Sequence, residues 1–200
     1  MADSYKTIKT LASGIYKEKG SKFISFAIPV NNVEEIYKII KEYKKTYFDA
    51  RHVCYAYMLG AERLDFRSND DSEPSGTAGR PILGQINSRE LTNILVIVVR
   101  YFGGVLLGTG GLTLAYKEAA SDALNQAQII EKNISILYEI FFDFMLMNDI
   151  MKIIKENEIQ ILNQNFDNQC YIQVLILKNM EVIVLGKLNK IIGLRIEKII

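Results

Sequence analysis

The sequence has few of the residues on which several common protein chemistries depend. Among its 200 residues there are one histidine, His52, and two cysteines, Cys54 and Cys170. A single histidine excludes a multi-histidine metal centre. The two cysteines are far apart and neither has a second cysteine at ligand spacing, which favours buried thiols over a zinc site or a disulfide. We therefore predict no metal site and no cofactor.

An excess of charge and a long apolar run are also missing. The formal net charge at pH 7 is +1, whereas nucleic-acid-binding domains usually show a marked basic excess, so only local basic patches could serve that purpose. No uncharged apolar run approaches the ~18 residues that a membrane span needs. The N-terminal stretch MADSYKTIKT lacks the apolar core of a secretory signal. We expect a soluble, cytoplasmic protein without a membrane partner, and its oligomeric state stays open.

Glycine is concentrated in one region of the chain. Eight of the thirteen glycines fall between Gly76 and Gly111, whereas the stretch after about residue 131 is rich in Ile, Asn and Lys and has two glycines. The length suffices for one large domain or two small ones, each with a hydrophobic core. The change in composition predicts two domains, residues 1–132 and 133–200.

The patterns of the first domain predict a mixture of strands and helices. Two alternating stretches on either side of Gly20 favour a β-hairpin, and residues 32–47 have helical spacing with Asn32 as N-cap. The remaining expected elements are strands at 52–59, around 63–68 and at 93–102, a short helix from Pro81, and a helix from Leu112 with alanines along one face.

The second domain has the pattern of a ferredoxin-like βαββαβ fold. Strands are expected at 136–144, 159–166, 170–177 and 194–200, with a helix at 147–158. The segment 180–191 is ambiguous, because its residue types favour a strand whereas symmetry with the first βαβ unit favours a helix.

A glycine-rich turn, RYFGGVLLGTGGL, lies between a buried strand and a helix. Glycine lets a ligand approach the backbone closely, and a helix N-terminus offers unpaired N–H groups to an anion. The turn matches neither the Walker A loop nor the dinucleotide fingerprint, and the alternative is that its glycines only permit a tight crossover. The candidate ligand-binding residues here are Arg100, Tyr101, Gly103, Gly104, Gly108, Gly110 and Gly111.

An acidic loop, DDSEPSGTAGRPILGQI, begins at Asp70. Asp71 and Glu73 could hold a divalent metal or act as an acid/base pair, but carboxylates in such a loop more often accept backbone N–H groups or pair with arginine. We favour this second interpretation and predict no catalytic residue. The loop and the only histidine complete the candidate ligand-binding set with His52, Asp71, Glu73, Ser75, Gly76 and Thr77.

Four stretches together resemble the IMPACT/YigZ family, and the match covers essentially the whole chain. They are EKGSKF from Glu18, RHVCYAY from Arg51, DDSEPSGTAGRPIL from Asp70, and VVRYFGGVLLGTGGLTLAY from Val98. The chain departs from the family pattern at two positions. Ser72 replaces a glycine, so a residue with less tolerance of positive φ would hold a tight turn, and Arg51 replaces a threonine and adds a charge.

The resemblance implies a two-domain α+β protein. Its N-terminal domain would be a βαβ-type domain similar to domain IV of elongation factor G and to a small-subunit ribosomal protein, and its C-terminal domain would be ferredoxin-like. Eukaryotic members of the family regulate translation by competing for an activator of an initiation-factor kinase. The expected function is therefore a translation-associated regulatory or binding role, with RNA, the ribosome or a translation factor as partner. The alternative is an enzyme that acts on a phosphorylated small molecule or nucleotide through the glycine-rich turn with Asp71 and Glu73.

Overall fold

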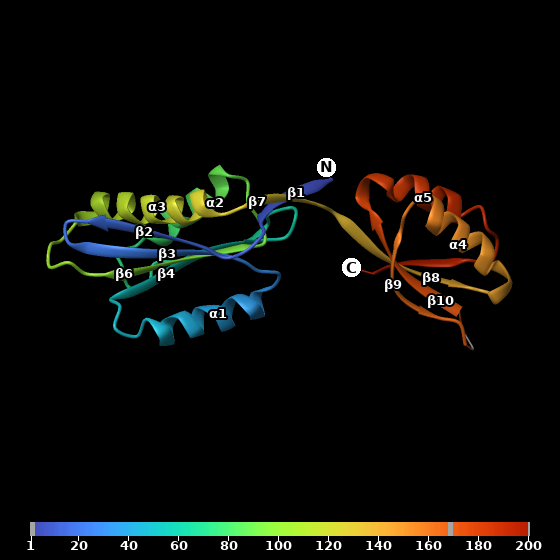
Figure 1. Cartoon of the computed structure of the whole chain (residues 1–200), viewed down its shortest axis with the longest axis horizontal. Coiled ribbons are helices and arrows are strands. Elements are labelled where there is room, and N and C mark those ends of the chain that lie inside the picture. The colour runs from blue at the N-terminus through green and yellow to red at the C-terminus, as the bar shows by residue number, and fades with distance from the viewer. Residues whose placement is uncertain (1–2, 168–169, 200) are drawn as a thin grey trace. The chain divides into compact units, whose positions relative to one another are not determined.

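The computed structural model describes residues 3–167 and 170–199, which form two compact units. The first unit is Tyr5–Lys132, and the second runs from Asn133 onward and includes Asp3 and Ser4. Both units combine helices with antiparallel sheets, so the fold is α+β, as the sequence predicts (Figure 1). No helix among the described residues is both long and apolar enough to cross a membrane.

The first unit is built on a five-stranded sheet. Its strands, in spatial order, are β2 (Ala12–Glu18), β3 (Ser21–Pro29), β6 (Ile94–Tyr101), β4 (His52–Leu59) and β5 (Asp65–Asn69), and each neighbouring pair is antiparallel. Helix α1 (Val33–Thr46) covers one face, and α2 (Gly79–Ser88) and α3 (Gly108–Gln126) cover the other (Figure 1). The central strand β6 is buried from Ile94 to Arg100, because both of its faces are covered.

Small residues let α3 lie close to the sheet. Ala115, Ala119 and Ala123 are fully buried. A Cβ at Gly14 in β2 would come within 2.6 Å of the backbone nitrogen of Ala123. The alanines that the sequence places on one face of this helix therefore pack against the sheet, and no side chain fits between the helix and β2 at this point.

Four loops meet at one end of this sheet. The β2–β3 turn, the α1–β4 loop and the β6–α3 loop lie together at that end (Figure 1). The strand register explains the convergence, because Arg100 near the end of β6 is paired with Phe23 at the start of β3 and with His52 at the start of β4. Strand β5 ends at Asn69, opposite Tyr55 of β4, so the acidic loop also begins there. Parts of all four family stretches therefore come together at this end of the sheet.

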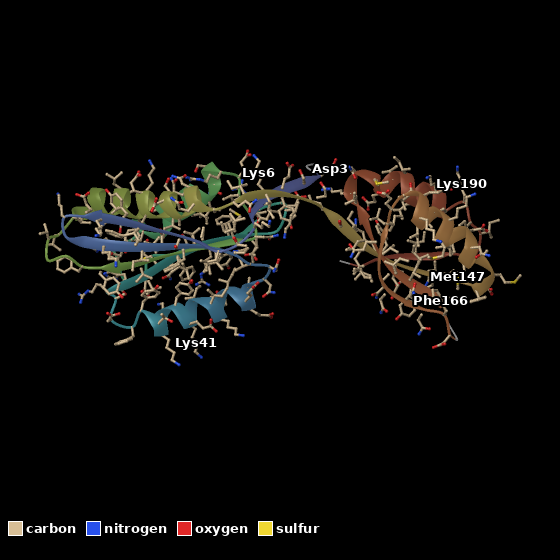
Figure 2. The ribbon with its side chains drawn as sticks, in the orientation of Figure 1. Asp3, Lys6, Lys41, Met147, Phe166 and Lys190 are labelled. Atoms are coloured by element: carbon tan, nitrogen blue, oxygen red, sulfur yellow. The ribbon has the colours of Figure 1, made fainter. Side chains whose placement is uncertain are left out.

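The second unit has a four-stranded antiparallel sheet in the order β11 (Arg195–Ile199), β8 (Ser135–Phe142), β10 (Cys170–Leu177) and β9 (Gln160–Asn165). Helices α4 (Met147–Glu156) and α5 (Glu181–Leu188) cover one face of it (Figure 1). This is the predicted ferredoxin-like order. Met147 and Phe166, both labelled in Figure 2, pack against the core that the helices and the sheet share.

Two features of the fold were not decided by the sequence. The ambiguous segment 180–191 contains the helix α5, because Val184 and Leu188, four residues apart, are both buried on its inner side. Strand β1 (Ser4–Ile8) pairs with β7 (Ile129–Asn133) in a separate two-stranded sheet. Short 3-10 turns at Phe144–Leu146 and Lys178–Met180 precede α4 and α5.

Candidate functional site

The converging loops surround an open pocket of about 1120 Å³. Its lining comes from the α1–β4 loop, the acidic loop, the end of β6, and the turn that leads into α3. The lining residues are 49–52, 72–74, 100–102, 106–109 and Leu112. The acidic loop and the glycine-rich turn, which are far apart in the sequence, therefore border the same space.

A buried ion pair lies at the base of the pocket. Arg100 is only 5% exposed, and its Nη1 donates to Oε1 of Glu73 at 2.6 Å. The Tyr116 hydroxyl donates to the same oxygen at 2.8 Å, and burial raises the pKa of Tyr116, which keeps the hydroxyl protonated as a donor. The guanidinium of Arg100 also lies over the rings of Phe23 and Phe102, 5.5 and 5.8 Å from their centroids. Within the described part of the chain, its buried Nε has no hydrogen-bond acceptor.

His52 stands beside this pair. Its Nδ1 lies 2.8 Å from the carbonyl oxygen of Asp71, and since a carbonyl can only accept, Nδ1 must carry the proton. The other ring nitrogen, Nε2, lies 3.6 Å from Oε1 of Glu73 and forms an ion pair only when the imidazole is protonated. The ring is thus held in one orientation at the pocket wall.

Asp70 occupies the N-terminus of α2. Its carboxylate accepts from the backbone N–H groups of Gly76 at 2.9 Å, Ala78 at 3.0 Å and Gly79 at 2.7 Å. Burial on its own would raise the pKa of Asp70, but these three donors and the charge of Arg80 outweigh it, and the pKa lies below its usual value. The anion bound at the N-terminus of α2 is therefore the chain's own Asp70 carboxylate.

The acidic loop is held in a tight turn by residues with left-handed backbone. The backbone N–H of Glu73 donates to the carbonyl of Asp70 at 2.9 Å, and between them Asp71 and Ser72 have φ values of 43° and 69°. Positive φ at both central positions is the requirement of a type I′ turn. Ser72 does hold the tight turn expected from the family comparison, in a conformation that suits glycine better.

Asp71 braces the loop against its neighbours. Its Oδ2 accepts from the backbone N–H of Val53 at 2.7 Å, and its Oδ1 pairs with Lys44 of α1 at 2.5 Å. It does not line the pocket but borders a smaller hollow beside α1. Cys54, at the next position of β4, is a free buried thiol, as the sequence predicts, and burial raises its pKa.

The N-terminus of α3 opens onto the pocket without a cap. The helix begins at Gly108, after Leu107; it has no acidic residue in its first turn, and no side chain among the described residues caps it. Gly108 and Thr109 line the pocket. The first N–H groups of a helix have no intrahelical partner and carry a partial positive charge. This helix end therefore has backbone donors at the border of the pocket, whereas those of α2 are bonded to Asp70.

Gly103 has a packing role. A Cβ on Gly103 would lie 1.9 Å from the backbone carbon of Gly20 in the β2–β3 turn, and its N–H donates to Oγ of Ser21 at 3.2 Å. The β2–β3 turn is therefore pressed against the start of the β6–α3 loop. This turn brings the exposed side chains of Lys17, Lys19 and Lys22 to the same end of the sheet.

The structure distributes the predicted ligand-binding residues over two groups. Those that line the pocket are His52, Glu73, Arg100, Tyr101 and Gly108. Those outside its lining are Asp71, Ser75, Gly76, Thr77, Gly103, Gly104, Gly110 and Gly111. Within the described residues, no group of three or more His, Cys, Asp or Glu side chains could hold a metal ion.

Several lining residues were not in the predicted set. They are Asp49, Ala50, Arg51, Ser72, Pro74, Phe102, Leu106, Leu107, Thr109 and Leu112. Phe102 and Leu106 are 49% and 85% exposed, and large apolar residues inside a glycine-rich turn are a signal that could have identified them. The Asp49 carboxylate accepts from the Tyr101 hydroxyl at 2.9 Å, a contact between loops that no local pattern reveals.

Comparison with known proteins agrees with this arrangement. The family model described as the Impact N-terminal domain matches residues 19–124, which include all the pocket residues. The IMPACT family member YvyE of Bacillus subtilis is 31% identical over 177 residues, which cover 86% of this chain and 82% of that protein. YigZ of Escherichia coli is 34% identical over 152 residues, 74% of each chain.

A solved structure extends the similarity to the fold of the whole chain. A crystal structure described as that of a hypothetical protein superimposes with a TM-score of 0.78 at 27% identity, and the match covers 100% of this chain and 99% of that one. The family model and the two relatives rest on the sequence, and the superposition rests on the fold. The chain belongs to the IMPACT family.

Proposed function

We propose that this protein is a translation-associated regulatory protein that binds RNA, free or in the ribosome, through the pocket at the end of the five-stranded sheet, and that it does so without catalysis. The link to translation comes from the family, whose eukaryotic members regulate that process. Family membership alone does not decide whether the binding partner is RNA or a translation factor. The chemistry of the pocket favours RNA.

The observation that carries the proposal is the group of hydrogen-bond donors and cationic side chains that borders one pocket. The uncapped end of α3 provides backbone donors, and Arg51 has its backbone N–H bonded to the carbonyl of Arg100 at 2.9 Å and its side chain exposed. Lys19 and its neighbours on the β2–β3 turn extend the basic surface. Phosphates bind to arginine, lysine and helix N-termini, so the pocket has the donors that an RNA backbone requires.

The rim of the pocket also suits bases. Phe102 is about half exposed and Leu106 is almost fully exposed, and both line the pocket beside the cationic groups. Unpaired bases stack on aromatic side chains, and this contribution tolerates different sequences. A single-stranded RNA therefore matches the pocket better than a duplex, whose bases are already stacked.

The acidic loop supports binding more readily than catalysis. The carboxylate of Asp70 is bonded to backbone N–H groups, that of Asp71 to Val53 and Lys44, and that of Glu73 to Arg100 and Tyr116. Each carboxylate thus has structural partners that would have to be replaced before it could act as a base.

An enzyme acting on a phosphorylated compound is the second candidate. The observation in its favour is that His52 and Glu73 line the same pocket as Gly108 of the glycine-rich turn. A thermal-shift screen of nucleotides with and without Mg²⁺, followed by analysis of the incubated nucleotides for products, separates the two functions. Conversion of a stabilising nucleotide favours the enzyme, and stabilisation without conversion favours the binding protein.

Direct binding of a single-stranded RNA, measured by fluorescence anisotropy over a series of salt concentrations, tests the proposal. Affinity should fall steeply as salt rises, and Arg51→Ala should weaken binding several-fold and reduce the salt slope by about one. Lys41→Ala removes the same charge from the outer side of α1, where Lys41 points away from the sheet (Figure 2), and should have little effect. Undetectable or salt-independent binding, to this RNA and to ribosomes, would leave protein partners only.

A further inference from the structure

We infer that the pocket receives a terminal phosphate monoester: the phosphorylated end of an RNA chain, or the phosphate of a free nucleotide. The RNA form of this inference rests on the function proposed above, whereas the phosphate site itself rests on the geometry alone. Three features of the described residues lead to it: the difference between two helix ends, a buried arginine whose Nε has no acceptor although its Nη1 is paired with Glu73, and the depth at which that arginine lies.

The two helices on the same face of the sheet differ in how their N-termini are satisfied. The end of α2 binds the Asp70 carboxylate through the N–H groups of Ala78 and Gly79. The 19-residue α3 has no acidic residue in its first turn and, within the part of the chain that the structure describes, no side-chain cap; it borders the pocket with Gly108 and Thr109. An anion bound in the pocket would accept hydrogen bonds from the N–H groups at the start of α3, as the Asp70 carboxylate does at the start of α2.

Arg100 provides the second, independent observation. Arg100 lines the pocket and is only 5% exposed, and its Nη1 donates to Glu73. Its Nε is buried without an acceptor in the part of the chain that the structure describes. A buried donor without a partner is costly, and a guanidinium with one side already paired can still bind a phosphate oxygen with the other.

The burial of these groups selects the end of a chain. An internal phosphodiester continues in both directions and can reach only exposed donors, such as Arg51. A terminal phosphate has one ester linkage, so it can enter a pocket whose base is formed by Arg100 and by the His52 side chain, which is 12% exposed. The monoester also carries more negative charge than a diester, which strengthens its bonds to cationic donors.

The remaining properties of the pocket are compatible with such a ligand. Its volume of about 1120 Å³ is slightly above the usual range for small-molecule sites, about 300–1,000 Å³, and leaves room for a nucleoside beside the phosphate. Phe102 could stack on the first base. The two carboxylates in the lining, Asp49 and Glu73, are bonded to Tyr101 and to Arg100 with Tyr116, so neither is an unpaired negative charge.

The test compares RNA ends that differ only in phosphate. Matched single-stranded RNAs with a 5′-phosphate or a 5′-hydroxyl, and with a 3′-phosphate or a 3′-hydroxyl, are labelled at the opposite end and titrated with the full chain. A nucleoside 5′-monophosphate is titrated separately by calorimetry. We expect one phosphorylated end to bind at least about ten-fold more tightly than its hydroxyl counterpart.

Two variants of Thr109 show whether α3 is responsible for this preference. Thr109→Glu adds a carboxylate to the first turn, which favours the helix through its dipole but repels a phosphate, so the protein should stay folded and lose the preference for phosphorylated ends. Thr109→Gln has nearly the same shape as the Glu variant without its charge, so it measures the effect of side-chain size alone and should lose much less of the preference. Loss of the preference in both variants would contradict the assignment to α3.

The outcomes separate the inference from the function on which it rests. Equal affinity for phosphorylated and hydroxyl ends would overturn the monoester inference while the proposed RNA binding stands. Binding of the nucleoside monophosphate, abolished by Thr109→Glu, without binding of any RNA would support the monoester site and overturn the RNA function. Binding of neither would overturn both.

Discussion

Three carboxylates within four residues have three different sets of partners in this protein. Asp70 binds the N-terminus of α2, Asp71 binds Val53 and the α1 helix through Lys44, and Glu73 holds Arg100. The same short loop therefore connects two helices and two strands of the first unit. At the scale of single residues, the loop is a brace, and the pocket lies on the side where Glu73 faces Arg100.

Ser72 is the residue at which this brace is strained. Its φ of 69° is left-handed, which costs a non-glycine residue roughly 1 kcal/mol. Ser72→Gly should therefore raise the free energy of unfolding by about 1 kcal/mol, measured by urea denaturation. Ser75→Gly is the matched control, because Ser75 is an exposed serine of the same loop without a positive φ. Glycine at this position makes the unfolded chain more flexible, so this variant should be less stable than the wild type. A loss of stability in both variants would contradict the claim that the backbone is strained at Ser72.

The Asp70 brace makes a definite prediction for pH. Because the pKa of Asp70 is lower in the folded protein than in the unfolded chain, its carboxylate contributes full stability above the unfolded pKa of about 4 and loses it as pH falls through the folded pKa. Asp70→Asn should cost about 1–2 kcal/mol at pH 7. Chemical denaturation measures the free energy of unfolding of both proteins, and the difference between them should shrink between pH 5 and pH 3. A difference that stays constant over this range would show that the charge of Asp70 plays no part.

At the scale of elements, the glycine-rich turn serves two purposes that its composition does not distinguish. Gly103 is in contact with the β2–β3 turn, whereas Gly108 starts a helix whose donors face the pocket. The two alternatives for the glycines, a tight crossover or close approach of a ligand, are therefore assigned to different residues of the same turn. The first is seen in the packing, and the second is part of our proposal.

The packing role of Gly103 can be tested by contrast with a glycine that has free space around it. Gly103→Ala would place a Cβ 1.9 Å from the backbone of Gly20, so the two loops must separate and stability should fall by several kcal/mol, roughly the upper range for point substitutions. Gly84→Ala, within α2, meets no atom within 4 Å and should gain about 0.5–1 kcal/mol from helix propensity. Thermal unfolding measures the stability of both variants. Similar small shifts of the melting temperature in the two would contradict the close contact between Gly103 and Gly20.

The elements themselves were largely predictable, because their signals are local. Helix α1 has apolar residues at helical spacing and uses Asn32 as its N-cap, with the side chain accepting from Glu35, and β6 is a continuous β-branched run. The segment of α5 was ambiguous because Ile183 and Val184 are strand-favouring types, and only burial of Val184 against the sheet decides its structure.

The site was less predictable than the elements, because it depends on contacts between distant segments. Glu73 and Arg100 are 27 residues apart, and their pairing follows from the register of β4, β5 and β6. Sequence patterns supplied the candidate residues on each loop but could not show which side of a loop faces the others. For this reason Asp71 and Gly103 were placed in the same predicted set as Glu73 and Arg100, although neither lines the pocket.

At the scale of the whole molecule, the two units differ in what they offer to RNA. From residue 133 onward, the sequence has seven Lys and Arg against eight Asp and Glu. The pocket, with Arg51, Arg100 and the end of α3, belongs to the first unit. In our proposal, this nearly neutral chain binds RNA by concentrating donors in one place, the pocket of the first unit.

The location of RNA binding is the central claim, and amide chemical shifts report it directly. We would titrate ¹⁵N-labelled protein with a short single-stranded RNA that carries terminal phosphates and follow the backbone amides. Our account predicts the largest changes at Gly108, Thr109, Arg51 and His52, which border the pocket, and small changes throughout the second unit. Unchanged shifts at these four amides, while those of other residues move, would contradict the account.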